Sequence, residues 1–404
     1  MQCPFSKSKL QRRPKTKIGA YVVFAGVSCI LTTGLNSGCS RDSQRVVFVI
    51  VDGSSSYSEI GKSVQVGAEF AQGKLPPLPD GSKLRLSLLD DKGSEELARK
   101  CALKAVASPD ALAVIGHATS GTTAAAVEIY GPQAMPLFMP VATNPDITLE
   151  AKNRHWANVF RLVPKDDFQA STIAEFCKSK LRAKRIVVLN DDSHYGTNLG
   201  NSLLGALSNQ KLEIAKHLVV DKFVDGRVNY TRYAEWIEAY APDVLVFAGY
   251  YEEGGAFISD LRSAGCYRPI ILTDGCFQSG LFTRINNQTT DIYCAFVAPD
   301  WAKLQSTEAL LKYVDRPAAE LTYAPFAADS IEIIFEAARN ILRHNDTLDR
   351  RALLSYLAEH REYGNRLLAG PYQFDSAGDN TQGRNYLYYL TLNRNSQPEW
   401  FFLR

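Results

Sequence analysis

Short apolar runs alternate with longer helix-spaced runs along most of this 404-residue chain. The apolar runs have the length and the Val, Ile and Leu content of buried strands. They occupy residues 46–51, 84–89, 113–116, 137–139, 185–189, 244–248 and 269–272. Residues with helical spacing occupy 63–72, 94–107, 121–130, 168–181, 199–209, 230–240 and 253–264. This alternation predicts an α/β fold, in which helices cover both faces of parallel sheets.

The length of the chain predicts more than one hydrophobic core. A single core stops growing at roughly 250–300 residues, and longer chains divide into domains. The sequence has no internal repeat and no low-complexity linker between two consecutive halves. We therefore expect two lobes that share the chain by crossing from one to the other more than once.

The N-terminus has the pattern of a bacterial export signal. Its basic residues are Lys7, Lys9, Arg12, Arg13, Lys15 and Lys17. Residues 18–31 are apolar, but they are shorter than the roughly 20 residues of a membrane-spanning helix. The segment ends at Leu-Asn-Ser-Gly-Cys, residues 35–39, which resembles a lipobox with Cys39 as the lipidated residue.

This pattern predicts a lipoprotein signal peptide at 1–38 and a lipidated linker at 39–44. An uncleaved N-terminal anchor is the alternative interpretation. Either one places the rest of the chain in the periplasm or on the cell surface, attached to a membrane.

Composition and motifs argue against several other functions. The chain has 45 Lys and Arg residues against 43 Asp and Glu residues, so a nucleic-acid partner is not expected. The cysteines beyond residue 39 allow at most two disulfides and have no zinc-ligand spacing. They are Cys101, Cys177, Cys266, Cys276 and Cys294. The sequence also lacks a Gly-x-Ser-x-Gly elbow, a P-loop and a His-Glu-x-x-His motif. We expect neither an enzyme nor a bound metal or cofactor.

Two neighbouring strands run into loops of small residues between 114 and 148. Residues 118–121 fall at the start of a predicted helix, where free N–H groups and the positive end of the helix dipole meet. Residues 141–143 follow the next strand and precede a turn predicted at Asn144-Pro145. Each loop alone also fits an ordinary capped junction between a strand and a helix. Together they are suited to hold one carboxylate.

The same two loops resemble those of the leucine/isoleucine/valine-binding proteins, the substrate-binding proteins of branched-chain amino acid ABC transporters. The matching motifs are Gly-His-x-x-Ser at 116–120 and Pro-x-Ala-Thr-x-Pro at 140–145. Segments at 89–91, 160–164, 165–169 and 370–378 also resemble the family, and all of them occur in the family's order. The resemblance therefore runs from about residue 45 to the end of the chain.

This resemblance implies the type I periplasmic binding protein fold, with two Rossmann-like lobes joined by three crossover strands. The N-terminal lobe is expected at 45–163 and 298–383, and the C-terminal lobe at 164–297 and 384–404. Candidate crossovers lie at 163–166, 296–300 and 382–386.

It also implies a ligand site between the lobes. The expected ligand-binding residues are Ser120, Val141, Ala142, Thr143, Tyr195, Tyr250 and Asp274. Asp274 lies 24 residues after Tyr250, the spacing the family uses for the acidic residue that accepts the ligand ammonium. A buried ammonium needs such a partner, because a charge without one is costly to bury. Ile60 stands where the family commonly has an aromatic residue, so the identity of the amino acid does not follow.

The function implied is that of a monomeric, lipid-anchored protein that captures a free amino acid, branched-chain or a close analogue, and delivers it to an ABC permease. One alternative is a sensing receptor of the same fold for an amide or urea-like ligand. Another is a von Willebrand factor A-like adhesion module. Asp-x-Ser-x-Ser at 52–56 and Thr-Asp-Gly at 273–275 resemble its Mg²⁺ site, although 222 residues separate Asp52 from Asp274.

Overall fold

The computed structural model describes residues 45–403, apart from residues 56, 221–228, 315–320, 345–346 and 365. The described residues all belong to one compact unit, Asp42–Arg404. The predicted signal peptide at 1–38, Cys39 and the linker at 39–44 lie outside the described residues. In the described part of the chain, every helix is too short or too polar to cross a membrane.

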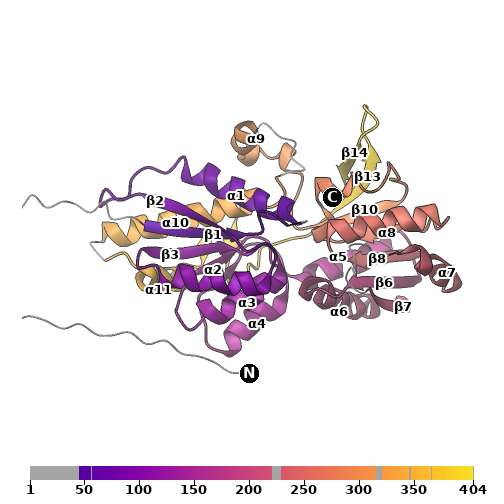
Figure 1. The fold of residues 1–404 in the computed structure, drawn as a ribbon, viewed down its shortest axis with the longest axis horizontal. Helices are drawn as coiled ribbons and strands as arrows, with labels where there is room; N and C mark the ends of the chain where they lie inside the picture. The colour runs from indigo at the N-terminus through magenta and orange to yellow at the C-terminus, as the bar shows by residue number, and fades with distance from the viewer. Residues whose placement is uncertain are drawn as a thin grey trace, which may run out of the picture. The chain divides into compact units, whose positions relative to one another are not determined.

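The first sheet has five parallel strands in the order β2-β1-β3-β4-β5. Figure 1 shows β2, β1 and β3 side by side. They are β1 (Arg45–Val51), β2 (Leu84–Asp90), β3 (Ala111–Gly116), β4 (Leu137–Met139) and β5 (Val159–Arg161). The helices α1 (Ser58–Gln72), α2 (Glu95–Ala107), α3 (Ser120–Tyr130) and α4 (Pro145–Asn153) alternate with them.

Alternating side chains of β1 explain why helices cover both faces of this sheet. Val47, Val49 and Val51 belong to the hydrophobic core that includes α1. Phe48 and Ile50 point the other way, into the core that includes α2 and α3. Successive side chains of a strand face opposite sides, so a strand that is apolar throughout must be covered twice.

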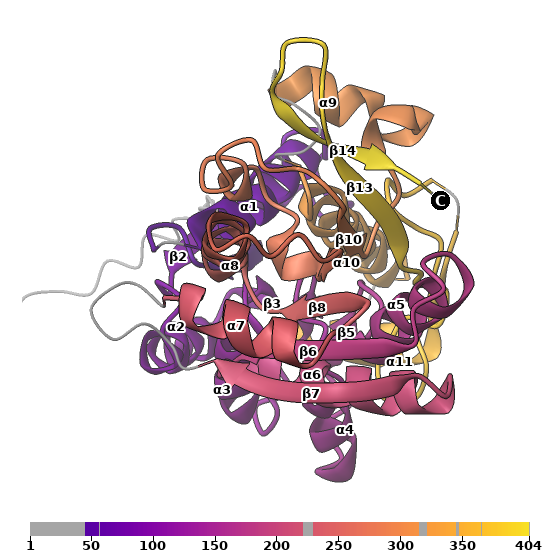
Figure 2. The same ribbon diagram turned by 90° about the vertical axis from the view of Figure 1, so that its right-hand side faces the viewer.

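The second sheet has seven strands in the order β14-β13-β10-β9-β8-β6-β7. They are β6 (Arg185–Asp191), β7 (Glu213–Val220), β8 (Val244–Ala248), β9 (Ile270–Leu272), β10 (Ile292–Phe296), β13 (Tyr386–Leu392) and β14 (Pro398–Phe402). Strands β6 to β10 pair in parallel, whereas β13 and β14 form an antiparallel hairpin added beside β10 (Figure 2). The helices of this part are α5 (Asp166–Ser179), α6 (His194–Asn209), α7 (Thr231–Ala239) and α8 (Tyr251–Ser263).

After β10 the chain returns to the first sheet. Helix α10 (Ala324–Arg343) packs along α1, and a Cβ atom added at Gly67 would lie 1.9 Å from the Ala324 carbonyl oxygen. Only glycine permits so close an approach of the two helix backbones. The remaining helices are α9 (Glu308–Val314) and α11 (Arg350–Glu359), with 3-10 turns at Asp274–Cys276, Ser279–Leu281, Trp301–Lys303 and Gln305–Thr307. The short strands β11 (Glu362–Tyr363) and β12 (Tyr372–Gln373) pair with each other before the chain enters β13.

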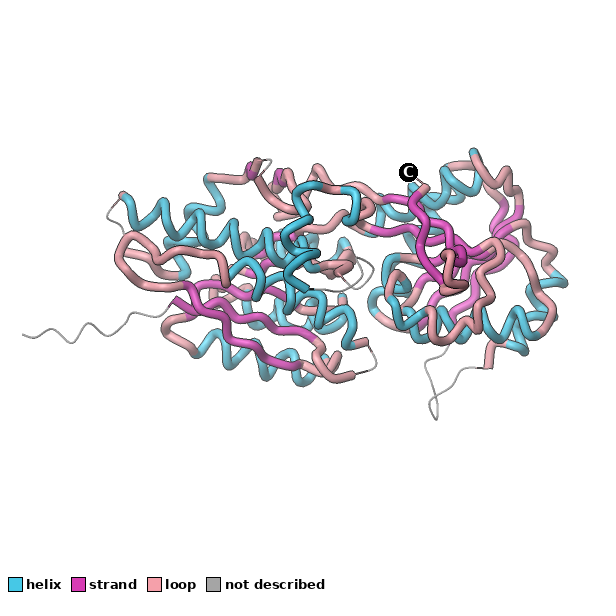
Figure 3. Tube along the Cα trace, turned by 90° about the horizontal axis from the view of Figure 1, so that it is seen from above, coloured by secondary structure: helices cyan, strands magenta, loops and turns pink. Residues whose placement is uncertain are grey.

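The structure confirms the predicted α/β fold with two Rossmann-like lobes, and helices flank the strands in both of them (Figure 3). The chain passes between the two sheets before α5, after β10 and before β13. The exact lobe boundaries, 45–163 with 298–383 and 164–297 with 384–404, stay a prediction.

Three local features differ from the sequence prediction. Asn144 and Pro145 do not form a simple turn: the Asn144 side chain caps α4, and Pro145 is in its first turn, where a missing N–H costs nothing. Strands β5, β7, β10, β11 and β12 and helices α4, α9, α10 and α11 were not predicted. The cysteines at 101, 177, 266, 276 and 294 are all free thiols, so the upper limit of two disulfides is not reached.

Candidate functional site

The first predicted ligand loop opens helix α3. Thr119 is the N-cap, and its hydroxyl accepts a hydrogen bond from the Thr122 N–H at 3.2 Å. Ser120 is the first helical residue and is buried. His117 lies just before the loop and is buried against Asp91, with Nδ1 2.5 Å from a carboxylate oxygen, so it holds the loop in place. The N–H groups of the first helical turn make this loop suited to an anion.

The second ligand loop follows β4 and is held by a buried arginine. The Arg161 guanidinium donates to the carbonyl of Ala142 at 2.5 Å and to the carbonyl of Asn144 at 2.8 Å. It also pairs with Asp379 at 2.8 Å. The carbonyls of Ala142 and Asn144 are therefore engaged, while the buried Thr143 hydroxyl has no hydrogen-bond partner among the described residues.

The second sheet contributes three residues from the ends of three neighbouring strands. Tyr195 lies in the first turn of α6 after β6, Tyr250 directly precedes α8 after β8, and Asp274 opens the 3-10 turn after β9. The carboxyl ends of parallel strands meet at one edge of a sheet, which is where open α/β sheets bind ligands. The rings of Tyr195 and Tyr250 pack against each other with centroids 5.1 Å apart.

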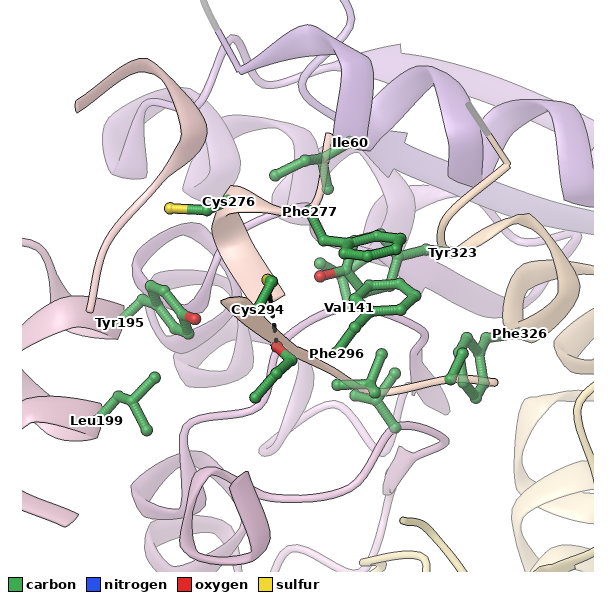
Figure 4. Packing of buried hydrophobic residues seen from close by; sticks show 14 of the residues in the cluster. Ile60, Val141, Tyr195, Leu199, Cys276, Phe277, Cys294, Phe296, Tyr323 and Phe326 are labelled. Carbon is green, nitrogen blue, oxygen red and sulfur yellow. Dashed lines mark hydrogen bonds between the residues drawn. The ribbon is translucent and has the colours of Figure 1, made fainter. Parts of the chain in front are cut away.

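All seven predicted ligand-binding residues line one cavity. Its lining is Ile60, Ala118, Thr119, Ser120, Val141, Ala142, Thr143, Tyr195, Tyr250, Asp274, Gly275 and Tyr323. The cavity volume is about 10 Å³, close to the least that one water molecule needs. Any ligand larger than water therefore requires the walls to separate. Figure 4 shows Ile60, Val141, Tyr195 and Tyr323 among the buried side chains of this region. The roles of the seven residues in ligand binding stay a prediction.

Asp274 is buried and surrounded by hydrogen-bond donors. Its Oδ1 accepts from the Tyr195 hydroxyl at 2.5 Å and from the Gln169 amide at 2.8 Å. Its Oδ2 accepts from the Tyr323 hydroxyl at 2.9 Å. Burial raises the pKa of Asp274 above its ordinary value, although the three donors oppose this shift. The carboxyl group is therefore fixed in position by three donors.

The sequence analysis missed several residues around this cavity. Gln169 was noted only as part of a family-like segment, and nothing in the pattern around Tyr323 distinguished it. Tyr57 lies just before α1, its ring packs 4.8 Å from that of Tyr250, and its hydroxyl donates to Glu253 at 2.5 Å. Burial raises the pKa of Glu253 to about 7. These contacts join residues far apart in sequence, so local patterns carry no signal of them.

Asp52, which the metal-site alternative assigns to a cation, accepts hydrogen bonds from its own loop. Its Oδ1 accepts from the N–H groups of Ser54 at 3.2 Å and Ser55 at 2.8 Å. Among the described residues, no three or more His, Cys, Asp or Glu side chains are grouped to hold a metal ion. Asp52 thus shapes the turn between β1 and α1.

The chain is similar in sequence to proteins that are named for binding amino acids. An amino acid binding protein of Pseudomonas aeruginosa is 27% identical over 204 residues, which cover 50% of this chain and 53% of that protein. A Leu/Ile/Val-binding protein of Citrobacter freundii is 25% identical over 282 residues, covering 63% and 74% respectively. The chain spans about half the length of the first of these relatives.

A solved structure has the same fold. The branched-chain amino acid transporter substrate-binding protein of Streptococcus pneumoniae, in complex with isoleucine, superposes with a TM-score of 0.74 at 22% identity, covering 89% of this chain and all of that one. The sequence profile of the family described as periplasmic binding protein matches residues 47–397. Since this match covers most of the chain and every residue of the cavity lining, the chain belongs to the periplasmic binding protein family.

Proposed function

We propose that this protein is an extracytoplasmic solute-binding protein that captures a free amino acid and delivers it to an ABC permease. One observation carries the proposal: a single cavity joins the small-residue loops at 118–121 and 141–143 to the buried carboxyl group of Asp274. An anion-binding end and an acidic end in one small cavity complement the carboxylate and the ammonium of an amino acid. Two relatives named for binding amino acids support the same reading.

The proposed roles follow from the chemistry of the lining. Ser120, Val141, Ala142 and Thr143 hold the carboxylate, largely through N–H groups and hydroxyls. Asp274 accepts the ammonium. Tyr195 and Tyr250 pack against the rest of the ligand.

Access to the cavity requires the loops at 118–121 and 141–143 to move away from Tyr195, Tyr250 and Asp274. Ligand binding then favours the closed arrangement by the difference between its affinities for the closed and open states. The Tyr57–Glu253 hydrogen bond links the loop before α1 to α8. It can form only when these two segments are in contact. We expect a monomer tethered by lipid at Cys39, in the periplasm or on the cell surface, whose closed form is recognised by the permease.

A calorimetric screen of the chain from Ser40 onward tests this function. The ligands are the twenty standard L-amino acids, urea and acetamide. The proposal predicts saturable binding of at least one amino acid with one site per chain, and no binding of urea or acetamide. Binding of urea or acetamide without any amino acid would favour the amide-sensing alternative instead.

A further inference from the structure

Four buried polar atoms beside the cavity lack hydrogen-bond partners within the part of the chain that the structure describes. They are both carboxyl oxygens of Asp166, the hydroxyl of Thr143 and the amide oxygen of Gln169. Asp166 is 0% exposed, and the other two residues are also buried. Buried polar groups in folded proteins almost always have a partner. All four atoms can accept a hydrogen bond, so the cluster is suited to a ligand group that donates several.

Asp166 is close to the charges of the proposed ammonium site. Burial, followed by the charge of Asp274, raises the pKa of Asp166 to about 8, and Asp167 adds to this shift. Thr143 and Arg161 act in the opposite direction. The Thr143 hydroxyl lies near enough to the Asp166 carboxyl group to lower its pKa, although neither group has a partner at ordinary hydrogen-bond geometry among the described residues. The Asp166 N–H donates to the Thr143 carbonyl at 3.1 Å. At neutral pH the Asp166 carboxyl group therefore carries a proton for most of the time.

The two nearest cations are engaged elsewhere. Arg161 pairs with Asp379 at 2.8 Å and donates to two loop carbonyls. Lys165 pairs with the same aspartate at 3.2 Å. Both cations are therefore paired with Asp379, so a positive charge on the ligand is available to stabilise the ionised form of Asp166.

We propose that Asp166 is a second acidic group of the ammonium site and acts through the Thr143 hydroxyl. The ligand ammonium donates to Asp274 and to Thr143 Oγ, and the Thr143 hydroxyl in turn donates to the Asp166 carboxylate. The proton that Asp166 carried passes to solvent as the ligand binds. This inference rests on the proposed function and narrows its ligand class to small molecules with a primary ammonium.

Proton release distinguishes this arrangement from a merely structural aspartate. Since the ammonium stabilises the ionised form of Asp166, binding of an amino acid at pH 7 should release up to one proton. The matching 2-hydroxy acid has no ammonium and should release none. Affinity for the amino acid should rise with pH up to about 8, where Asp166 loses its proton without help.

The test is calorimetry at pH 7 in PIPES and in imidazole, whose ionisation enthalpies differ and neither of which is a primary ammonium. The probes are the tightest binder among the twenty standard L-amino acids and its 2-hydroxy analogue. Wild-type protein should give a buffer-dependent enthalpy with the amino acid alone. Asp166→Asn should abolish that buffer dependence. It should also weaken binding of the amino acid roughly 10-fold, about the effect of losing one charge-assisted hydrogen bond. Asp167→Glu is the matched control: it keeps the exposed neighbouring charge that contributes to the pKa shift of Asp166, so it should release protons like the wild type.

Each result decides a different point. If no amino acid binds, the proposed function fails, and this inference fails with it. If an amino acid binds without proton release, or if Asp166→Asn releases as many protons as the wild type, the function stands and the role of Asp166 is wrong. The comparison of the amino acid with its hydroxy analogue uses wild-type protein alone, so it decides the matter even if Asp166→Asn does not fold.

Discussion

The Tyr195 hydroxyl donates a hydrogen bond to Asp274 Oδ1 at 2.5 Å, and it also accepts one from the Gly275 N–H at 3.2 Å. The two side chains follow β6 and β9, which are separated in the sheet by β8 alone. Tyr195 thus fixes the direction of the carboxyl group toward the cavity that both residues line. An acid held in this way is ready for a cationic partner, because its position need not change on binding.

The first prediction concerns the charge of Asp274. Asp274→Asn keeps the shape of the side chain and removes its charge, so it should weaken binding of an α-amino acid by roughly 2 to 5 kcal/mol, the range for one member of a buried charge pair. Thr143→Ala should cost about 1 to 3 kcal/mol, since N–H groups of the two loops still face the carboxylate. Calorimetric dissociation constants of both variants measure the difference.

The 2-hydroxy acid is the control for this comparison. It keeps the carboxylate and lacks the ammonium, so Asp274→Asn should affect it much less than the amino acid. The melting temperature of each free variant tests whether the fold is intact. Equal losses for both ligands in a folded variant would mean that Asp274 serves only the local hydrogen-bond network.

The sequence predicted the part of the site that depends on strand ends. Ser120, Thr143, Tyr195, Tyr250 and Asp274 each follow a strand, and parallel strands bring their carboxyl ends to one edge. Knowing the fold was therefore enough to place these residues near one another. Their positions within each lobe follow from local patterns of strand, loop and helix.

The remaining residues could not be predicted, because their role comes from contacts between distant segments. Gln169 lies within the first turns of α5, where a polar residue usually faces solvent, yet it donates to Asp274. Tyr323 precedes α10, a helix that the sequence analysis did not identify. Tyr57 meets Tyr250 and Glu253 only because the loop before α1 reaches the second sheet's helices. Strand β7 was missed because it is an edge strand whose Glu213 and Lys216 are polar and exposed.

The second prediction separates a solute receptor from a metal-dependent adhesion module. Ligand binding should be unchanged by a chelator, since the proposed contacts to the amino acid use protein groups alone. Asp52→Ala should lower the melting temperature, because the Ser54 and Ser55 N–H groups lose their acceptor. Loss of amino acid binding on chelation, restored by Mg²⁺ in wild type but not in Asp52→Ala, would favour the metal-site alternative.

The third prediction concerns the anchor at Cys39. If this cysteine is lipidated, Cys39→Ser should move the protein from the membrane fraction to the soluble extracytoplasmic fraction. Ser40→Ala is a matched control that leaves the cysteine in place. Mass spectrometry of the mature N-terminus measures cleavage and lipidation directly. A mature protein that keeps residues 1–38 and stays in the membrane would instead support an uncleaved anchor.

The last prediction is a pH dependence of stability that originates at Glu253. Burial raises the pKa of this side chain from 4.5 to about 7. The folded protein therefore binds a proton more tightly than the unfolded chain does, and the free energy of unfolding should fall as the pH rises from about 4.5 to about 7. The expected loss is about 1 to 3 kcal/mol, since one pKa unit corresponds to roughly 1.4 kcal/mol.

Glu253→Gln keeps an acceptor for the Tyr57 hydroxyl and removes the charge, so its stability should decline less over this range. Urea unfolding at pH 5 and pH 8 measures both slopes, and Glu235→Gln, an exposed position on α7, should behave like the wild type. Identical slopes for wild type and Glu253→Gln would show that other acids, such as the buried Asp329 with its pKa raised by burial to about 6, account for the pH dependence.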